Sequence, residues 1–270
     1  MRTRAFASLG EVPIVGLGTW NMERDDARAA EEALRRGLER GLTHIDTAEM
    51  YGSGACEQIV AKAIAGQRDK VFLVSKVLPR NASYKGTLKA CEASLKRLGT
   101  DHLDCYLLHW RGNEPLAETF RAFGELVKAG KIRSWGVSNF DDADLAEALA
   151  IVGEGQIACN QVLYHLDERS IEHRVLPWCE QHGVEVVAYS PFGSGRFKSN
   201  ATLDGIAARL GATPRQVALA FLARRSFVIP KSSSAAHVDE LAREVELDDA
   251  AVAAIAAAFP VPAWRGLPSL

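Results

Sequence analysis

Hydrophobic positions along the chain follow two alternating patterns. Short continuous runs of aliphatic and β-branched residues are typical of buried strands, and longer segments between them carry apolar residues at the helical period. The runs are Val15–Gly18, Thr43–Asp46, Val71–Lys76, Leu103–His109, Ile132–Val137, Gln156–Val162, Val184–Ser190 and Phe227–Lys231. The helical segments include Ala27–Arg40, Tyr84–Leu98 and Leu116–Lys128.

This alternation of eight strands with helices predicts an α/β protein with a parallel sheet. Parallel strands joined by crossover helices are covered on both faces, which explains why the runs are apolar throughout. Eight such units match a closed (β/α)8 TIM barrel better than an open sheet, and 270 residues suffice for one barrel. We therefore expect residues 1–270 to form a single catalytic domain.

Segments outside the repeat predict additions to the barrel. Residues 1–13 can form a short hairpin that covers the barrel floor. Two helical stretches, Leu203–Leu210 and Pro214–Arg225, lie between the last two strands, and Thr213 is suited to cap the second. Asp248–Phe259 predicts a further helix, so we expect extra C-terminal helices before the tail.

Composition and charge exclude several classes of protein. Hydrophobic residues make up 47% of the chain, charged residues make up 24%, and the net charge is -2. No basic excess exists to attract nucleic acid or an anionic membrane. No apolar run approaches the roughly 20 residues of a membrane span, and no signal peptide is evident. We expect a cytoplasmic monomer without nucleic-acid or membrane partners.

Cysteine and histidine positions give no sign of a disulfide framework or a metal site. The five cysteines are odd in number and include no C-x-x-C pair, which fits reduced thiols. Cys105 and Cys159 lie in apolar runs, so we expect them to act as small buried hydrophobes. His173 and His182 have no partners at ligand spacing, and we expect no bound metal.

Four polar residues stand where strands end. Asp46, Lys76 and His109 close the second, third and fourth runs, and Tyr51 follows the second. Each alone has an ordinary explanation, such as a loop cap, a solvated strand end or packing. In a barrel, however, the carboxyl ends of neighbouring strands converge at the active-site mouth. A carboxylate, an ammonium, a phenol and an imidazole placed together predict an enzyme that donates protons.

The role of each residue follows from this chemistry. A phenol titrates near 10, and an ammonium about 4 Å away can lower its pKa by roughly three units. Tyr51 is therefore the expected general acid, and Lys76 is expected to lower its pKa. Asp46 would keep Lys76 charged, and His109 would donate to a substrate carbonyl. Because no Ser or Cys nucleophile motif is present, the expected nucleophile is hydride from a nicotinamide.

Nucleotide-binding residues are expected at the later strand ends rather than in a Rossmann motif. Gly16 and Gly18 begin like G-x-G-x-x-G, but Asn21 takes the third position and no helix is expected there. The alternative candidates are Ser138, Asn139 and Gln161 for a carboxamide, Tyr189 for stacking on the nicotinamide, and Lys231 with Ser232 for a phosphate.

Over essentially its whole length, the chain resembles the aldo-keto reductase family. The matching stretches are I-D-T-A-E-M-Y, L-V-S-K, L-L-H-W, G-V-S-N-F, N-Q-V, A-Y-S-P and I-P-K-S. The resemblance implies a catalytic tetrad of Asp46, Tyr51, Lys76 and His109, and NADPH bound by Ser138, Asn139, Gln161 and Tyr189. It also implies that the loop Ser190–Arg196, with Ser190 and Phe192, covers the pyrophosphate. Within the family, the chain is most similar to short bacterial members that reduce methylglyoxal and other small aldehydes to alcohols.

The chain departs from the family pattern where the adenosine 2'-phosphate should bind. His237 stands at the usual arginine position and Leu241 at the usual asparagine, although Glu240 matches. Histidine is only partly protonated near pH 7 and lacks the bidentate fork of arginine. We therefore expect a weaker and pH-sensitive preference for NADPH, with NADH as a possible substitute.

Aromatic and apolar residues next to the strand ends suggest the rim of a substrate pocket. Trp20, Met50 and Trp110 are adjacent to expected mouth residues, and Trp264 lies in the tail. The tail after Phe259 has eleven residues and is expected to be too short to enclose the pocket. An open pocket for small carbonyl compounds is therefore predicted.

Two other functions remain open. A nucleotide-sensing subunit with little turnover could share this fold, although the intact tetrad argues against it. A barrel isomerase could use His109 or Tyr51 for enolisation. However, the phosphate-binding glycine loops expected after the last strands are incomplete, and no carboxylate base is evident.

Overall fold

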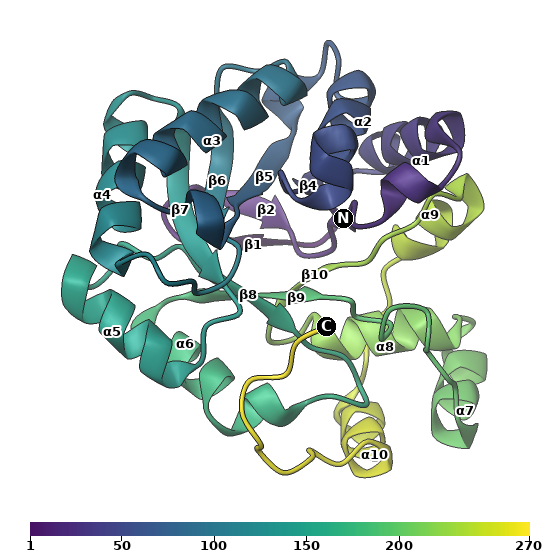
Figure 1. Cartoon of the computed structure of the whole chain (residues 1–270). Helices are drawn as coiled ribbons and strands as arrows, with labels where there is room; N and C mark the ends of the chain where they lie inside the picture. Colours follow the sequence, from purple (N-terminus) through teal and green to yellow (C-terminus); the bar gives the residue numbers. More distant parts are fainter.

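A closed barrel of eight parallel strands forms the centre of the computed structural model, which describes all 270 residues (Figure 1). The strands are β3 (Leu17–Gly18), β4 (His44–Asp46), β5 (Phe72–Val77), β6 (Leu103–Leu108), β7 (Ile132–Ser138), β8 (Cys159–Leu163), β9 (Glu185–Tyr189) and β10 (Phe227–Ile229). Each strand pairs in parallel with the next one in sequence. Bridges from Val15 to Val228 and from Gly18 to Lys231 join the first strand to the last. The predicted (β/α)8 fold is confirmed.

Ten α-helices surround the strands (Figure 1). They are α1 (Ala27–Glu39), α2 (Ala55–Ala63), α3 (Tyr84–Leu98), α4 (Leu116–Lys128), α5 (Asp142–Val152), α6 (Val175–His182), α7 (Ala201–Leu210), α8 (Pro214–Leu222), α9 (Ala235–Leu241) and α10 (Asp249–Ala258). Short 3₁₀ helices cover Met22–Arg24, Tyr51–Gly54, Arg68–Lys70, Pro79–Asn81 and Ser170–His173. None of the helices combines the length and the apolar character needed to cross a bilayer.

Both predicted helices before β10 are present. Thr213 caps α8 in a reciprocal arrangement, because its hydroxyl accepts from the Gln216 amide and the Gln216 side chain accepts from the Thr213 amide. The helix ends at Leu222 rather than at Arg225, since the chain turns there toward β10.

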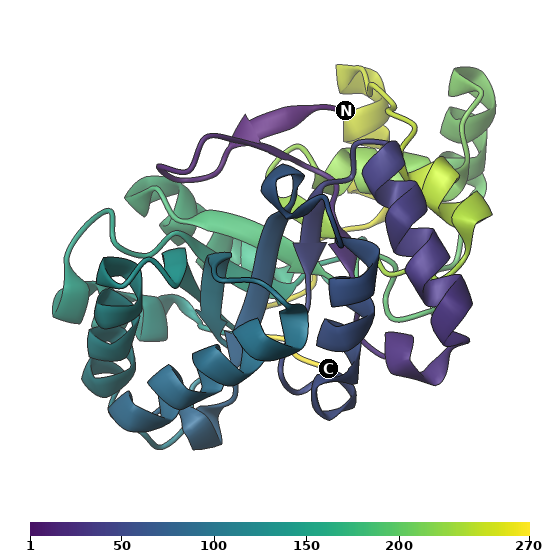
Figure 2. The ribbon, with the colours of Figure 1, turned by 90° about the horizontal axis from the view of Figure 1, so that it is seen from above.

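A hairpin closes the floor of the barrel, as predicted. Strands β1 (Thr3–Ala5) and β2 (Glu11–Pro13) pair antiparallel. Figure 2 shows the hairpin on one side of the barrel and the C-terminus of the chain on the other. The Phe6 ring lies 4.8 Å from that of Phe72 and 5.0 Å from that of Phe227, measured between centroids. The mouth is therefore the end of the barrel where the strands finish.

His44 lies in the same aromatic cluster at the barrel floor. It is buried, and neither ring nitrogen has a hydrogen-bond partner. Its ring meets that of Phe72 edge to face at 5.3 Å. Burial lowers the pKa of His44 to about 4, so the imidazole is neutral at physiological pH.

All five cysteines are buried and unpaired. Cys105 and Cys159 are neighbours inside the barrel, as the sequence predicted for small buried hydrophobes. Burial raises the pKa of Cys56, Cys91 and Cys179 to about 12, so these thiols are protonated.

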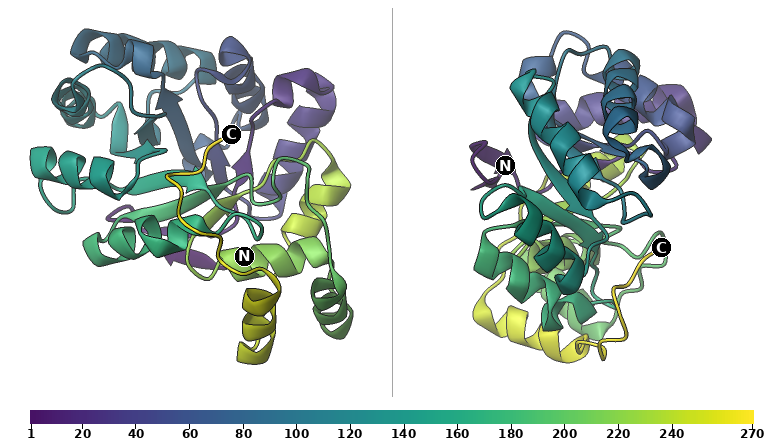
Figure 3. Two further views of the ribbon diagram at one scale, coloured as in Figure 1. Left: turned by 60° about the horizontal axis from the view of Figure 1, so that its bottom comes forward. Right: turned by 60° about the vertical axis from the view of Figure 1, so that its left-hand side comes forward.

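The tail after α10 returns across the barrel mouth (Figure 3). Leu267, Ser269 and Leu270 line the central cavity, so the tail, which was expected to be too short to enclose the pocket, does contribute to its wall. The segment after Phe259 is irregular, and eleven extended residues can span up to about 36 Å. Trp264 is not part of the pocket rim and instead packs against the core beneath the Arg174 guanidinium.

Candidate active site

Lys76 is the centre of a hydrogen-bonded group at the barrel mouth. Its ammonium Nζ donates to Asp46 Oδ2 at 2.6 Å, to the Thr47 carbonyl at 2.9 Å and to the Tyr51 hydroxyl at 3.1 Å. Asp46 pairs with Val74 in the parallel register, and Lys76, two residues further along β5, faces the same side. The lysine side chain is fully buried. The structure thus brings together the three residues that the sequence placed at neighbouring strand ends.

The hydrogen bonds of this group leave the Tyr51 proton free for donation. An ammonium has three N–H donors, and all three of Lys76 are used. The Tyr51 oxygen is the acceptor of one of them, so its own hydrogen can point into the cavity that Tyr51 lines.

Burial dominates the electrostatics of the resting site. It lowers the pKa of Lys76, while the adjacent Asp46 carboxylate acts in the opposite direction and favours the charged ammonium. Burial, with Asp46 nearby, raises the pKa of Tyr51 well above its usual value. The expected lowering of the phenol pKa by Lys76 is therefore not found in the resting site. Tyr51 remains a protonated donor, and the ammonium is placed to stabilise the phenolate that forms when the proton leaves.

His109 completes the group as a neutral imidazole. It is buried at the cavity wall, its ring lies 5.7 Å from that of Tyr51 between centroids, and its Nδ1 has no partner. Burial, with the Lys76 charge as the next cause, lowers the pKa of His109 to about 2. A neutral imidazole carries one N–H and can donate it to a carbonyl oxygen beside Tyr51.

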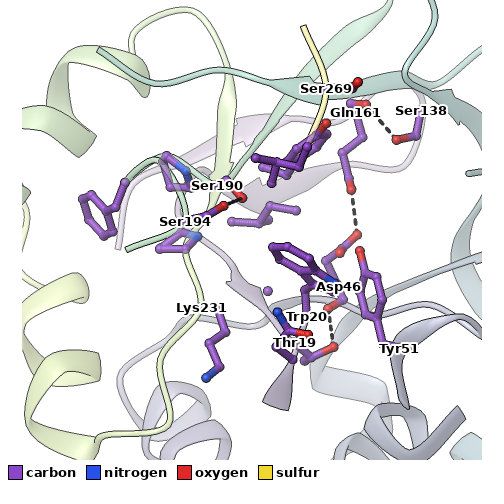
Figure 4. A pocket seen from close by; sticks show the side chains of 18 of the residues that line it. Thr19, Trp20, Asp46, Tyr51, Ser138, Gln161, Ser190, Ser194, Lys231 and Ser269 are labelled. Carbon is purple, nitrogen blue, oxygen red and sulfur yellow. Dashed lines mark hydrogen bonds between the residues drawn. The ribbon is translucent and has the colours of Figure 1, made fainter. Parts of the chain in front are cut away.

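Gln161 is tied to the same group by a contact that the sequence did not suggest. Its Nε2 donates to Asp46 Oδ1 at 2.7 Å, so Asp46 accepts from both Lys76 and Gln161 (Figure 4). The amide oxygen of Gln161 has no protein donor and remains available to a ligand amide. Sequence spacing alone gave no signal for this contact, because β4 and β8 lie on opposite sides of the barrel.

Asn139 is held in place by three hydrogen bonds. Its Nδ2 donates to the His109 carbonyl at 3.0 Å and to Ser138 Oγ at 3.1 Å, and its Oδ1 accepts from the Tyr189 hydroxyl at 2.9 Å. The backbone of Asn139 has a φ of 58°, a left-handed conformation that asparagine tolerates better than most residues. These contacts tie the end of β7 to the end of β6 and, across β8, to the end of β9 at the mouth.

One cavity of about 1080 Å³ opens at the mouth and contains the sequence-predicted contact residues. They are Trp20, Met50, Trp110, Ser138, Asn139, Gln161, Tyr189, Ser190, Phe192, Lys231, Ser232, His237 and Glu240. Trp20, Met50 and Trp110 are more than one third exposed, as expected of a rim. The volume slightly exceeds the usual range for small-ligand pockets and suits a dinucleotide together with a small substrate. The structure places these residues together, and their individual roles stay predictions.

The end of the cavity at β10 and α9 contains several charged groups. Lys231 forms an ion pair with Asp25, which also accepts from Ser233 Oγ at 2.5 Å. These two hydrogen bonds lower the pKa of Asp25. Figure 4 shows Lys231 apart from Asp46 and Tyr51. Arg215 and Phe197 also line the cavity. Sequence reasoning missed Arg215 because it lies in the first turn of α8 rather than after a barrel strand, and missed Phe197 because it lies one residue beyond the predicted loop Ser190–Arg196.

Comparisons with a family model, with related sequences and with solved structures all point to one family of enzymes. The model of the Aldo/keto reductase family matches residues 14–259. The methylglyoxal reductase YeaE of Escherichia coli is 48% identical over 268 residues, which cover 95% of this chain and 94% of that protein. The glyoxal reductase of Bacillus subtilis is 35% identical, covering 82% of this chain and 79% of that protein. A crystal structure of an aldo/keto reductase from Klebsiella pneumoniae in complex with NADP and acetate superposes with a TM-score of 0.94 at 43% identity, covering 99% of both chains.

Proposed function

The chain belongs to the aldo/keto reductase family and is an oxidoreductase, and on that premise we propose that it reduces methylglyoxal and similar small aldehydes with NADPH. The observation that carries this proposal is the Lys76 ammonium, which is bonded to both the Asp46 carboxylate and the Tyr51 phenol. The relatives named as methylglyoxal and glyoxal reductases support the substrate class.

In the proposed mechanism, the residues of the tetrad deliver a proton to the carbonyl oxygen. The nicotinamide, when bound, supplies hydride to the carbonyl carbon. Tyr51 gives its proton to the oxygen, and Lys76 stabilises the resulting phenolate through the 3.1 Å contact. His109 orients the carbonyl by donating its N–H. Solvent then returns a proton to Tyr51, so that carbonyl, hydride and proton together give the alcohol.

The cavity residues fit a nicotinamide nucleotide. The free amide oxygen of Gln161 can accept from the carboxamide, and the Tyr189 ring at the end of β9 offers an aromatic face. At the other end, Ser232 and Lys231 are proposed phosphate contacts, although Lys231 must exchange its contact with Asp25. We keep NADPH as the proposed cofactor, with NADH as a weaker substitute because His237 replaces an arginine.

The rim favours small substrates. Trp20, Met50 and Trp110 give the mouth an apolar wall, and the tail residues Leu267 and Leu270 line the cavity as well. Because these tail residues add to the apolar wall, we expect the pocket to suit a three-carbon aldehyde better than a bulky ketone. Small aldehydes are therefore the proposed class, and turnover of steroid ketones without turnover of small aldehydes would contradict this proposal.

The test is a panel of methylglyoxal, glyoxal and a bulky ketone, each with NADPH and with NADH, followed by the absorbance of the reduced nicotinamide. Oxidation of NADPH with methylglyoxal is expected, and the Tyr51→Phe variant is the matched inactive control. If NADPH binds but no carbonyl compound oxidises it, the nucleotide-sensing alternative is favoured instead.

A further inference from the structure

Arg215 is the only lysine or arginine lining the cavity that has no acidic partner. Arg111, on the substrate side, forms an ion pair with Asp144 at 3.2 Å. Lys231 is paired with Asp25. Arg215 is exposed, lines the same cavity and makes no hydrogen bond or ion pair with another side chain. Its guanidinium is therefore available to an anionic ligand.

The packing of α8 on α9 places Arg215 at the adenosine end of the proposed nucleotide site. Gln216 Nε2 donates to the Glu240 carbonyl at 2.8 Å, and the Thr213 hydroxyl bonds to the Glu240 carboxylate. These contacts flank Arg215 in sequence and hold the first turn of α8 against α9. His237, on α9, lines the cavity too. Arg215 thus lies close to the position where the family resemblance expects an arginine and this chain has a histidine.

The charges at this end do not favour a phosphate without Arg215. Lys231 is already paired with Asp25, the Glu240 side chain is acidic, and His237 lacks the fork of N–H donors that an arginine would offer a phosphate. A phosphate monoester carries close to two negative charges at pH 7. Arginine is always charged and can bind a phosphate with two parallel hydrogen bonds.

Phe197 restricts where the guanidinium can go. The Arg215 guanidinium lies 5.8 Å from the centroid of the Phe197 ring, which is half-buried and packs edge to face on Phe192 at 5.6 Å. A cation over an aromatic face is attracted to it, so the exposed Arg215 guanidinium is drawn toward the part of the cavity wall that Phe197 forms. This reduces the entropy that phosphate binding would otherwise cost.

We infer that Arg215 supplies the cation that binds the adenosine 2'-phosphate of NADPH, in place of the arginine that His237 replaces on α9. Arg215 is thereby the residue that sets the preference for NADPH over NADH. The inference rests on the proposed function for the identity of the nucleotide, but it concerns binding and not turnover.

Calorimetric titration with 2',5'-ADP and with 5'-AMP tests this inference without any reaction. The two probes share the adenosine and differ in the 2'-phosphate. Arg215→Ala removes one charge-assisted bidentate contact. The variant should therefore bind 2',5'-ADP roughly 10- to 100-fold more weakly than the wild type and bind 5'-AMP with unchanged affinity. Arg215→Lys should give an intermediate loss. Arg224→Ala removes an exposed arginine just after α8 that does not line the cavity, so this control should bind both probes as the wild type does.

Each other outcome has a definite meaning. An equal loss of affinity for both probes would show that Arg215 contacts a group they share, the adenosine or the 5'-phosphate, and would overturn the inference. Unchanged binding of 2',5'-ADP by Arg215→Ala, or a wild type that does not bind 2',5'-ADP, would overturn it as well. If the wild type binds 2',5'-ADP through Arg215 but reduces no aldehyde, the proposed function fails alone. If methylglyoxal is reduced but Arg215→Ala binds 2',5'-ADP normally, the inference fails alone. A thermal melting temperature of Arg215→Ala within a few degrees of the wild type's shows that the variant is folded.

Discussion

Replacing Tyr51 by phenylalanine removes a single oxygen from the centre of the site. The ring stays in its buried position, and Lys76 keeps its contacts of 2.6 Å to Asp46 and 2.9 Å to the Thr47 carbonyl. One buried N–H of Lys76 loses its acceptor, which costs about 1–3 kcal/mol of stability. For a chain of this size, each kcal/mol lowers the Tm by roughly 2–4 °C, so the variant should remain folded.

The effect of Tyr51→Phe on activity should be much larger than its effect on stability. Proton transfer by a positioned acid contributes about 10²–10⁴-fold, so kcat/KM for methylglyoxal should fall at least about 100-fold, or roughly 3 kcal/mol in the barrier. The affinity for NADPH should stay close to that of the wild type. Steady-state kinetics, NADPH fluorescence titration and thermal melting measure the three quantities on one preparation.

Tyr164→Phe is the matched control for this experiment. Tyr164 is also buried, and its hydroxyl donates to Glu172 at 2.7 Å, but it does not line the cavity. This variant should lose a comparable amount of stability and keep its turnover. If Tyr51→Phe retains kcat/KM within tenfold of the wild type while binding NADPH normally, Tyr51 is not the general acid and the proposed mechanism is refuted.

Three further predictions concern His109, His44 and Gln161. Because the pKa of His109 is lowered to about 2, kcat at saturating NADPH should show no inflection near pH 6.5, and an inflection that disappears in His109→Gln would contradict the neutral imidazole. The folded-state pKa of His44 is about 4, below the usual 6.5, so the unfolded chain takes up the proton first as the pH falls. The free energy of unfolding should therefore decrease between pH 6.5 and pH 4, by up to about 3 kcal/mol. His44→Leu should therefore flatten the difference between urea unfolding at pH 7 and at pH 5, and an unchanged difference would assign it to other groups. Gln161→Leu removes one of the two side-chain donors to Asp46 and the free amide oxygen, so fluorescence titration should show NADPH affinity about fivefold to tenfold weaker, whereas unaltered affinity would remove Gln161 from the nucleotide site.

The barrel and the grouping of the tetrad follow from patterns that a sequence displays directly. Continuous apolar runs identify parallel strands, and the barrel then requires residues at successive strand ends to converge. The convergence of strand ends was enough to predict that Asp46 and Lys76 lie together, because they lie at the ends of neighbouring strands and face the same side of the sheet. Whether residues 1–270 act as one domain stays a prediction.

Features that depend on burial or on packing between distant helices were not accessible in this way. The pKa of Tyr51 is raised because the phenol is buried, and no spacing rule reports the depth of burial. Arg215 looks like an ordinary surface residue until α8 is seen packed on α9. The tail has no periodicity to analyse, so neither its return to the mouth nor the separation of Trp264 from the rim could be anticipated.

The burial of all five thiols gives the protein a built-in reporter of its own opening. A thiol-reactive dye cannot reach them while the barrel is intact, so the rate of labelling under native conditions counts opening events rather than surface chemistry. The same arrangement makes heating without a reductant hazardous, because opened chains can cross-link through thiols that the native fold protects from oxidation.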